Sequence, residues 1–278
     1  MKLYKTETNI IAEEGGEYFV LENPDWDNLI NRDDLYNHLQ ASIKNLSPAG
    51  TENLLKAHPV KAPLNSQEIW AAGVTYQRSK TARMEESKES GGATFYDKVY
   101  EAERPELFFK AIAQRTVGHN DFVKIRKDST WDVPEPELTL FITSSAKIVG
   151  YTIGNDMSSR SIEGENPLYL PQAKCYDRSA GLGPCIYVPE QPISSDTKIS
   201  MQILRDGKKV FEGDTLINQM KRSHEELGKF LFAECSFPCG VFLMTGTCIV
   251  PGNDFTLQSK DEIQITVDNI GTLINFVA

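Results

Sequence analysis

The sequence contains no hydrophobic run that approaches the length of a membrane-spanning helix. Residues 1–7 also lack the apolar stretch that is typical of a secretory signal peptide. No internal repeat and no low-complexity tract is present, which argues against a repeat array or a disordered linker protein. The chain therefore has the pattern of an ordinary globular protein without a membrane segment.

Cysteine and histidine are scarce, with five and four copies respectively. An odd number of cysteines in a long, core-forming chain indicates reduced thiols rather than a disulfide framework. Cys235 and Cys239 have three residues between them, and no second cysteine or histidine pair lies nearby, which argues against a zinc site. From these absences we expect a cytoplasmic protein.

Positive charge is in deficit, because 29 lysines and arginines face 39 acidic residues, for a formal net charge of −10. This balance argues against nucleic acid or an anionic membrane as a partner. It does not exclude a small anionic substrate, since the field of a bound metal ion can locally override the net charge.

The 278 residues suffice for one or two domains, and 40% hydrophobic with 24% charged residues is ordinary for a globular protein. We expect a small N-terminal module over residues 1–60, with a strand over 17–21 and a helix over 32–44. Proline and glycine at 47–50 and proline at 59 and 63 separate it from a catalytic domain over 61–278.

The catalytic domain is rich in short apolar segments bounded by turn residues, which predict strands. A turn over 143–147 predicts a hairpin between two of them, and Asp206-Gly207 predicts another. Helices are expected from Tyr76 to Lys88 and from Leu216 to Phe232. Many strands and few helices indicate an α+β, β-rich roll or sandwich. The expected strands are 69–74, 107–112, 138–142, 148–153, 199–204, 209–211, 241–244, 263–267 and 273–276.

Two carboxylates in a proline-rich segment are the strongest functional signal. Glu135 and Glu137 alternate with prolines that keep the backbone extended, so both side chains should share one face. Asp156 lies across the expected hairpin. Three oxygen donors without a histidine or cysteine nearby suit a hard divalent ion such as Mg²⁺, Mn²⁺ or Ca²⁺. Glu-Pro-Glu alone is equally compatible with a solvated acidic edge strand.

Several further motifs occur in a fixed order along the chain. Asn155-Asp156 is followed by Ser158 and Arg160, the segment 174–184 contains Lys174, Asp177, Gly183 and Pro184, and Thr245-Gly246-Thr247 stands near the C-terminus. This set resembles the fumarylacetoacetate hydrolase family, over roughly residues 61–278. The resemblance implies a mixed β-sandwich roll, a divalent metal held by the three carboxylates, and a homodimer.

Other segments are similar to one branch of that family. Residues 96–100, 104–110, 117–119 and 165–172 look like those of the 2-keto-3-deoxy-D-arabinonate dehydratases, which are lyases of sugar-acid catabolism. The resemblance implies loss of water from a 2-keto-3-deoxy sugar acid through a metal-stabilised enolate. For the five-carbon acid, the product would be 2-oxoglutarate semialdehyde.

Two residues are candidates for proton transfer. Together with a divalent ion, Lys174 would offset the three carboxylates and bring the net charge of the site to zero. It would bind the keto oxygen or donate a proton. Glu106 opens an apolar strand, where burial can raise a carboxyl pKa towards the working range. The structural alternatives are a surface lysine and a strand-end glutamate that points to water.

Thr245 and Thr247 are the candidates for binding the substrate carboxylate, through a hydroxyl and the backbone N–H groups around Gly246. Arg78 and Arg83 are further candidates, on a charged stretch ending at Gly91-Gly92 that we expect to act as a lid over the substrate. An exposed helix is the alternative for this stretch.

The segment 73–82 also distinguishes between reactions. Hydrolases of the family carry a histidine and a glutamate here that activate water, whereas this chain has Ser79 and Ala82. Serine without a base activates water poorly, which favours elimination over hydrolysis. Glu85 or Glu86 would supply a base if the register shifted.

Three other functions stay open at this point. They are carbon–carbon hydrolysis of acylpyruvate-type or fumarylacetoacetate-type diketo acids, decarboxylation of an oxaloacetate-type acid, and a non-catalytic binding protein that keeps the fold.

Overall fold

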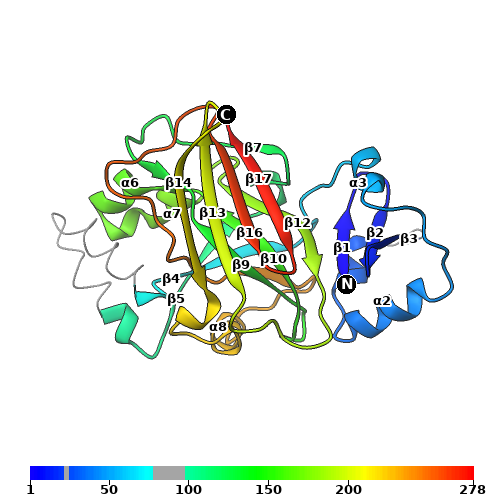
Figure 1. Cartoon of the computed structure of the whole chain (residues 1–278). Helices are drawn as coiled ribbons and strands as arrows, with labels where there is room; N and C mark the ends of the chain where they lie inside the picture. The colour runs from blue at the N-terminus through cyan, green and yellow to red at the C-terminus, as the bar shows by residue number, and fades with distance from the viewer. Residues whose placement is uncertain (22–24, 78–97) are drawn as a thin grey trace.

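The computed structural model describes residues 1–21, 25–77 and 98–278 (Figure 1). Its largest element is a ten-stranded mixed sheet with the order β3-β2-β1-β12-β10-β9-β15-β4-β5, to which β6 adds by pairing in parallel with β12. Its strands are β1 (Lys2–Lys5), β2 (Ile10–Glu14), β3 (Glu17–Leu21), β4 (Glu68–Gly73), β5 (Glu106–Ala111), β6 (Thr116–Val117), β9 (Pro136–Ile142), β10 (Ile148–Asp156), β12 (Ala180–Tyr187) and β15 (Val241–Met244).

A second sheet packs against the middle of the first and has the order β14-β13-β16-β17-β7. Alternate residues of β16 are buried, as expected for a sheet with one face on the core and one towards solvent. Two packed, mixed sheets confirm the expected β-rich sandwich roll. The strands are β7 (Asp121–Val123), β13 (Lys198–Arg205), β14 (Lys208–Leu216), β16 (Glu262–Val267) and β17 (Gly271–Val277).

The helices are short and lie around the sheets. In α2, Leu35, Leu39 and Ile43 recur at helical spacing and are buried against the N-terminal strands. The helices of the described residues are α1 (Trp26–Ile30), α2 (Leu35–Ile43), α3 (Asn53–Ala57), α6 (Arg160–Glu165), α7 (Leu170–Lys174) and α8 (His224–Leu231). The same residues form the 3₁₀ turns η1 (Ala113–Arg115), η2 (Pro167–Tyr169) and η3 (Ile217–Gln219). A separate two-stranded ribbon consists of β8 (Asp132–Val133) and β11 (Ser158–Ser159).

The central strand β9 separates two hydrophobic cores. Leu138, Leu140 and Ile142 face the core between the two sheets, whereas Phe141 belongs to the core on the opposite face, which α2 also covers. Every residue of β9 is therefore buried. By the same alternation along β9, Glu137 lies on the face of Phe141, away from the second sheet.

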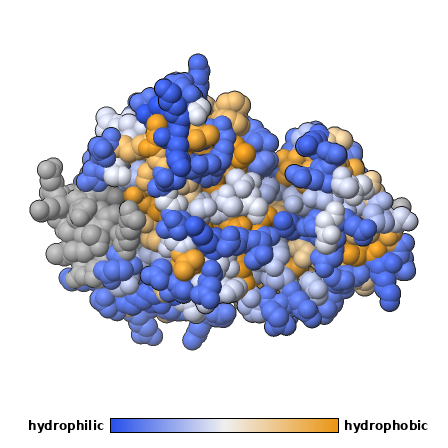
Figure 2. All heavy atoms as spheres, viewed as in Figure 1, coloured by the Kyte–Doolittle hydropathy of each residue, from blue (hydrophilic) through white to orange (hydrophobic). Residues whose placement is uncertain are grey.

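The molecular surface seen in Figure 2 is mostly hydrophilic, with apolar side chains in scattered patches.

The helix expected from Leu216 to Phe232 is wrong in its first half. Strand β14 continues to Leu216, which pairs with Lys198 of β13, and residues 217–219 form the 3₁₀ turn η3. Helix α8 begins only after Ser223, whose side chain accepts a hydrogen bond from the Glu226 N–H. The other expected helix, from Tyr76 to Lys88, lies outside the described residues from position 78 onwards.

The N-terminal residues contain the expected strand, as β3, and the expected helix, as α2. Strand β1 pairs antiparallel with β12, with Lys2 opposite Tyr187, so the three N-terminal strands extend the large sheet. The division into a module over 1–60 and a catalytic domain over 61–278 stays a prediction. Among the described residues, no helix is long and apolar enough to cross a membrane.

Candidate metal centre and active site

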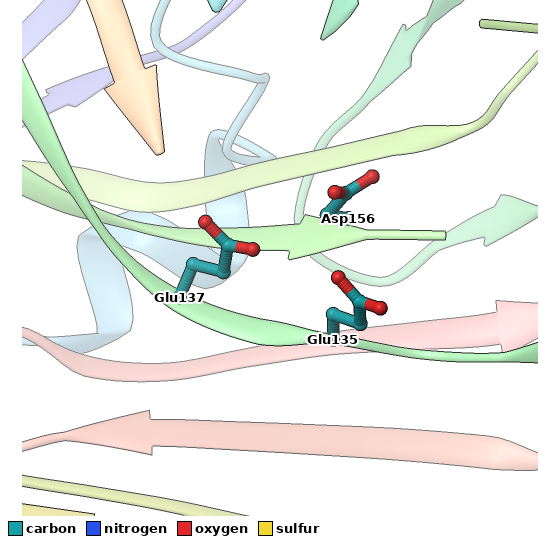
Figure 3. Close-up of side chains that lie close together, drawn as sticks. All are labelled: Glu135, Glu137 and Asp156. Carbon is teal, nitrogen blue, oxygen red and sulfur yellow. The ribbon is translucent and has the colours of Figure 1, made fainter. Parts of the chain in front are cut away.

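Three carboxylates meet where β9 begins and β10 ends. The predicted hairpin joins these strands, and Gly154 lies opposite Glu137, which places Asp156 on the same face as Glu135 and Glu137. Figure 3 shows the three carboxylates turned towards one another. Their solvent exposure is only 3%, 1% and 1% for Glu135, Glu137 and Asp156, which excludes the solvated acidic edge as their explanation.

The geometry of the three carboxylates fits a hard divalent ion. One oxygen from each side chain lies within 4.8 Å of the others, and carboxylate oxygens are the ligands that Mg²⁺ and Ca²⁺ prefer. Burial, and then the charges of Asp156 and Glu135, raise the pKa of Glu137 well above its usual range. A bound cation would offset this repulsion.

Lys174 lies inside this cluster, as expected from the sequence, and is completely buried. Its ammonium donates to Glu135 Oε2 at 2.7 Å, to Asp156 Oδ2 at 2.9 Å and to Ser158 Oγ at 2.6 Å. The alternative of a surface lysine is therefore wrong. Its part in catalysis stays a proposal.

Two more cations complete the cluster. Arg160 Nη2 contacts Glu135 Oε1 at 2.5 Å, so it pairs with a metal-site carboxylate. Lys110 is fully buried, and its ammonium lies 2.5 Å from Asp156 Oδ1. The three carboxylates and three cations sum to zero. With a divalent ion the cluster would carry +2, so the neutral total expected from Lys174 alone is wrong.

Sequence reasoning missed Lys110. It lies within the apolar strand β5, where Phe108 and Phe109 precede it and Ala111 follows. Lysines are seldom fully buried unless they are paired, so a lysine inside a short apolar strand was the available signal. Burial lowers the pKa of Lys110, and the neighbouring Asp156 charge opposes that shift.

Glu106 begins the same strand and is partly exposed. Its carboxylate lies so close to Gly73 that a side chain added at that glycine would collide with it. Gly73 and Phe108 both line a small pocket at the metal centre, so Glu106 lies at the pocket wall. The pocket is lined by Ala72, Gly73, Val74, Phe108, Glu135, Glu137, Asp156, Arg160, Gly246 and Thr247.

The turn after β15 supports the metal centre from the other side. The Gly246 N–H donates to Glu137 Oε2 at 2.6 Å, so it positions a metal-site carboxylate. Thr245 is fully buried and donates its hydroxyl hydrogen to the Leu138 carbonyl at 2.8 Å. Thr247 lines the pocket. Substrate binding by Thr245 and Thr247 stays a prediction.

Gly246 has a backbone φ of +94°, which favours glycine. A side chain there would also collide with the Thr75 hydroxyl and approach the Ala72 carbonyl oxygen to 3.0 Å. Both constraints hold the Gly246 N–H against Glu137.

Several other candidates lie away from the cluster or outside the described residues. Arg78 and Arg83, with the proposed lid and Ser79 and Ala82, fall in the undescribed range 78–97. His119, which lies in the matched segment 117–119, accepts a hydrogen bond on Nδ1 from the Ile274 N–H at 3.2 Å. All five cysteines are free thiols, and the described residues contain no metal-ligating group that includes cysteine or histidine.

Comparison with known proteins decides the family. The model of the fumarylacetoacetate (FAA) hydrolase C-terminal domain matches residues 68–278. The chain belongs to this family. The match includes the three carboxylates, the three cations and Thr247, so the whole cluster lies within the family domain.

Two relatives within the family are described as dehydratases. A "probable 2-keto-3-deoxyxylonate dehydratase" of Haloferax volcanii is 50% identical over 216 residues, which cover 77% of this chain and 73% of that protein. A 2-dehydro-3-deoxy-D-arabinonate dehydratase of Saccharolobus solfataricus is 42% identical over 232 residues, covering 80% and 77%.

Solved structures agree with this similarity. The structure of a 2-keto-3-deoxy-D-arabinonate dehydratase complexed with magnesium and 2,5-dioxopentanoate is 35% identical and covers 100% of this chain and 98% of that one, with a TM-score of 0.85. The apo form has a TM-score of 0.86. The similarity therefore extends over the N-terminal strands as well as the family domain.

Proposed function

We propose that this protein is a divalent-metal-dependent dehydratase that converts a five-carbon 2-keto-3-deoxy sugar acid into 2,5-dioxopentanoate, which is 2-oxoglutarate semialdehyde. The observation that carries the proposal is the buried cluster of three carboxylates around Lys174, in a chain 50% and 42% identical to two dehydratases. A related structure holds magnesium and the expected product together.

The two relatives' substrates point to one compound. Arabinonate and xylonate of the D series differ only at C2 and C3, and a C2 ketone with a C3 methylene removes both stereocentres. The D-arabinonate and D-xylonate derivatives are therefore the same molecule, with a single stereocentre at C4. We accordingly assign the five-carbon acid with the D configuration as the substrate.

The reaction removes a proton from C3 and the hydroxyl group from C4 as water. A bound divalent ion would polarise the C2 carbonyl and stabilise the negative charge that develops as the C3 proton leaves. The cluster has the donors for Mg²⁺, with Mn²⁺ and Ca²⁺ as chemical substitutes. Glu135, Glu137 and Asp156 would hold that ion.

Lys174 and Glu106 would move the protons. The Lys174 ammonium already donates three hydrogen bonds in the cluster and is our candidate for binding the keto oxygen or protonating it. Glu106 at the pocket wall is our candidate base at C3 or acid at the C4 hydroxyl. To reach 2,5-dioxopentanoate, one proton must then leave C5 and one the C5 hydroxyl, while one returns to C3 and one to C4, so the same groups would act more than once.

The substrate carboxylate would bind at the turn after β15 and at the arginines of segment 78–97. We propose Thr247 and Thr245 for the turn, and Arg78 and Arg83 for that segment. Support for Thr247 is its place in the pocket lining, next to Gly246.

An NMR time course with Mg²⁺ and 2-keto-3-deoxy-D-arabinonate tests the proposal. We expect conversion to 2,5-dioxopentanoate that EDTA abolishes. Acetylpyruvate and oxaloacetate in parallel tubes test the alternatives. Cleavage of acetylpyruvate to acetate and pyruvate with the sugar acid untouched would identify a hydrolase. Carbon dioxide from oxaloacetate alone would identify a decarboxylase, and no turnover in any tube would favour a binding protein.

We further propose a cytoplasmic homodimer. Five free thiols, of which Cys185 and Cys248 are buried, suit a reducing compartment. Light scattering coupled to gel filtration tests the oligomeric state, and a mass of twice 31.2 kDa is the expected result.

A further inference from the structure

Strand β5 presents three different side chains to the metal centre. Glu106, Phe108 and Lys110 occupy alternate positions along it, and a register shift against β4 lies between Phe109 and Ala111. Phe108 lines the pocket and Glu106 lies beside Gly73, also in its lining. Lys110 is completely buried and is the charged member of the three to which the reaction assigns no part.

The Lys110 ammonium makes one ion pair and two hydrogen bonds. It pairs with Asp156 Oδ1 at 2.5 Å and donates to the Met157 carbonyl at 3.0 Å and to the Lys174 carbonyl at 2.5 Å. Asp156 ends β10 and Met157 follows it directly, whereas Lys174 is the last residue of α7. One side chain thus joins the segment that carries a metal ligand to the segment that carries the catalytic candidate.

Asp156 is held between two ammonium groups. Lys110 contacts its Oδ1, and Lys174 contacts its Oδ2 at 2.9 Å. Rotation of the carboxylate would break both contacts at once, so its plane is fixed. The backbone that carries Lys174 is fixed by the same Lys110 ammonium.

We propose that Lys110 is a positioning residue, which holds the Asp156 carboxylate and the Lys174 main chain in one geometry so that the ion and the Lys174 ammonium meet the substrate together. The proposal rests on metal-dependent dehydration as the function of the site. It assigns Lys110 no contact with the substrate.

The sign of a change in metal affinity tests this role. A purely electrostatic effect predicts tighter metal binding when Lys110 is replaced, because a positive charge next to the ion is removed. Loss of positioning predicts weaker binding, since residues that orient metal ligands typically contribute about 10–100-fold in affinity. The two explanations therefore predict opposite results for the same variant.

The experiment measures Mn²⁺ binding by electron paramagnetic resonance without substrate, for wild type and Lys110→Met. Methionine keeps most of the side-chain volume but has no ammonium group. We expect Mn²⁺ affinity to fall at least about tenfold, and kcat to fall by a similar factor or more with KM little changed. The matched control is Lys198→Met, a strand lysine paired with Asp214 at 3.2 Å and away from the pocket lining, which should change neither quantity.

Unchanged or tighter Mn²⁺ binding by folded Lys110→Met would overturn the proposal, even if the variant melted at a lower temperature. Should that variant not fold, Lys110→Arg decides, because a planar guanidinium keeps the charge but cannot direct three N–H groups from one atom. Weaker Mn²⁺ binding by Lys110→Arg supports positioning, and wild-type binding refutes it. Since no substrate is present, failure here leaves the dehydratase assay unaffected, and the reverse also holds.

Discussion

Replacing Glu137 by glutamine tests the metal centre most directly. The amide has nearly the same shape as the carboxylate and can still accept the Gly246 N–H, which now lies 2.6 Å from Glu137 Oε2. The substitution removes one of the three charges that an ion would meet. Among the described residues, no ion pair reaches Glu137, whereas Glu135 and Asp156 each contact two cations. Glu137 is thus the carboxylate whose charge is least neutralised by the protein.

The expected effect on metal affinity is large. Groups that only orient metal ligands typically contribute about 10–100-fold in affinity, so removal of a direct carboxylate ligand should exceed the upper end of that range. We expect the Mg²⁺ dissociation constant of Glu137→Gln to rise more than about 100-fold, which is about 2.7 kcal/mol. Turnover at fixed Mg²⁺ should be lost together with binding.

Without metal, the same substitution should leave the thermal stability of the protein unchanged or raise it. Burial and two neighbouring carboxylates raise the pKa of Glu137, which means that its charge is unfavourable in the folded protein. In EDTA, Glu137→Gln should therefore unfold at the same temperature as wild type or higher.

Isothermal titration with Mg²⁺, the NMR turnover assay and thermal unfolding in EDTA measure these effects. The control is Glu262→Gln, the same substitution at the start of β16 and outside the pocket lining, with wild-type behaviour expected. Wild-type Mg²⁺ affinity in Glu137→Gln would refute the assignment of Glu137 as a ligand. A lower melting temperature in EDTA would refute the argument from repulsion.

Four further predictions follow from single side chains. Lys174→Met should keep Mg²⁺ affinity within about tenfold and lose at least about 100-fold in kcat, compared by calorimetry and NMR. Glu106→Gln should lose about 10²–10⁴-fold in kcat and one limb of the pH–rate profile. Gly246→Ala should lower the free energy of unfolding in urea by at least about 2 kcal/mol, whereas Gly16→Ala, with φ +87° and no atom within 4 Å, should cost only about 1 kcal/mol. Burial lowers the pKa of His224, so the unfolded chain binds a proton at a higher pH than the folded protein does. The free energy of unfolding should therefore fall as the pH drops below about 6.5, and it should fall less steeply in His224→Gln.

The hairpin of β9 and β10 and its carboxylates could be predicted because their signals are local. The turn residues before Lys147 set the pairing, and the alternation of Glu135 and Glu137 sets the face. Strand β12 could not be predicted in the same way, because Gly181, Gly183 and Pro184 argue against a central strand. The structure tolerates them through a register shift of β12 against β10 and a close approach of the second sheet.

The buried cations were harder to predict than the carboxylates because they come from other segments. Lys110 and Lys174 reach the cluster from β5 and α7, and nothing in their local sequence fixes that meeting. Leu216 shows the same limit for secondary structure, since its apolar spacing suits a helix and its partner in β13 makes it a strand.

The three cations change the stage of the reaction at which the net charge of the site reaches zero. With Lys174 alone, three carboxylates and a divalent ion reach zero before any substrate binds. With Lys110 and Arg160 included, the loaded cluster carries +2. A keto acid brings one negative charge on its carboxylate, and Glu106 at the pocket wall brings another when it acts as the base, so the site is neutral once the substrate is bound. Transfer of the C3 proton to Glu106 leaves this total unchanged but moves the negative charge from Glu106 to the enolate, next to the metal centre and its cations. Electrostatic stabilisation is therefore greater for the transition state than for the bound substrate, which is the condition for a faster reaction and not merely tighter binding.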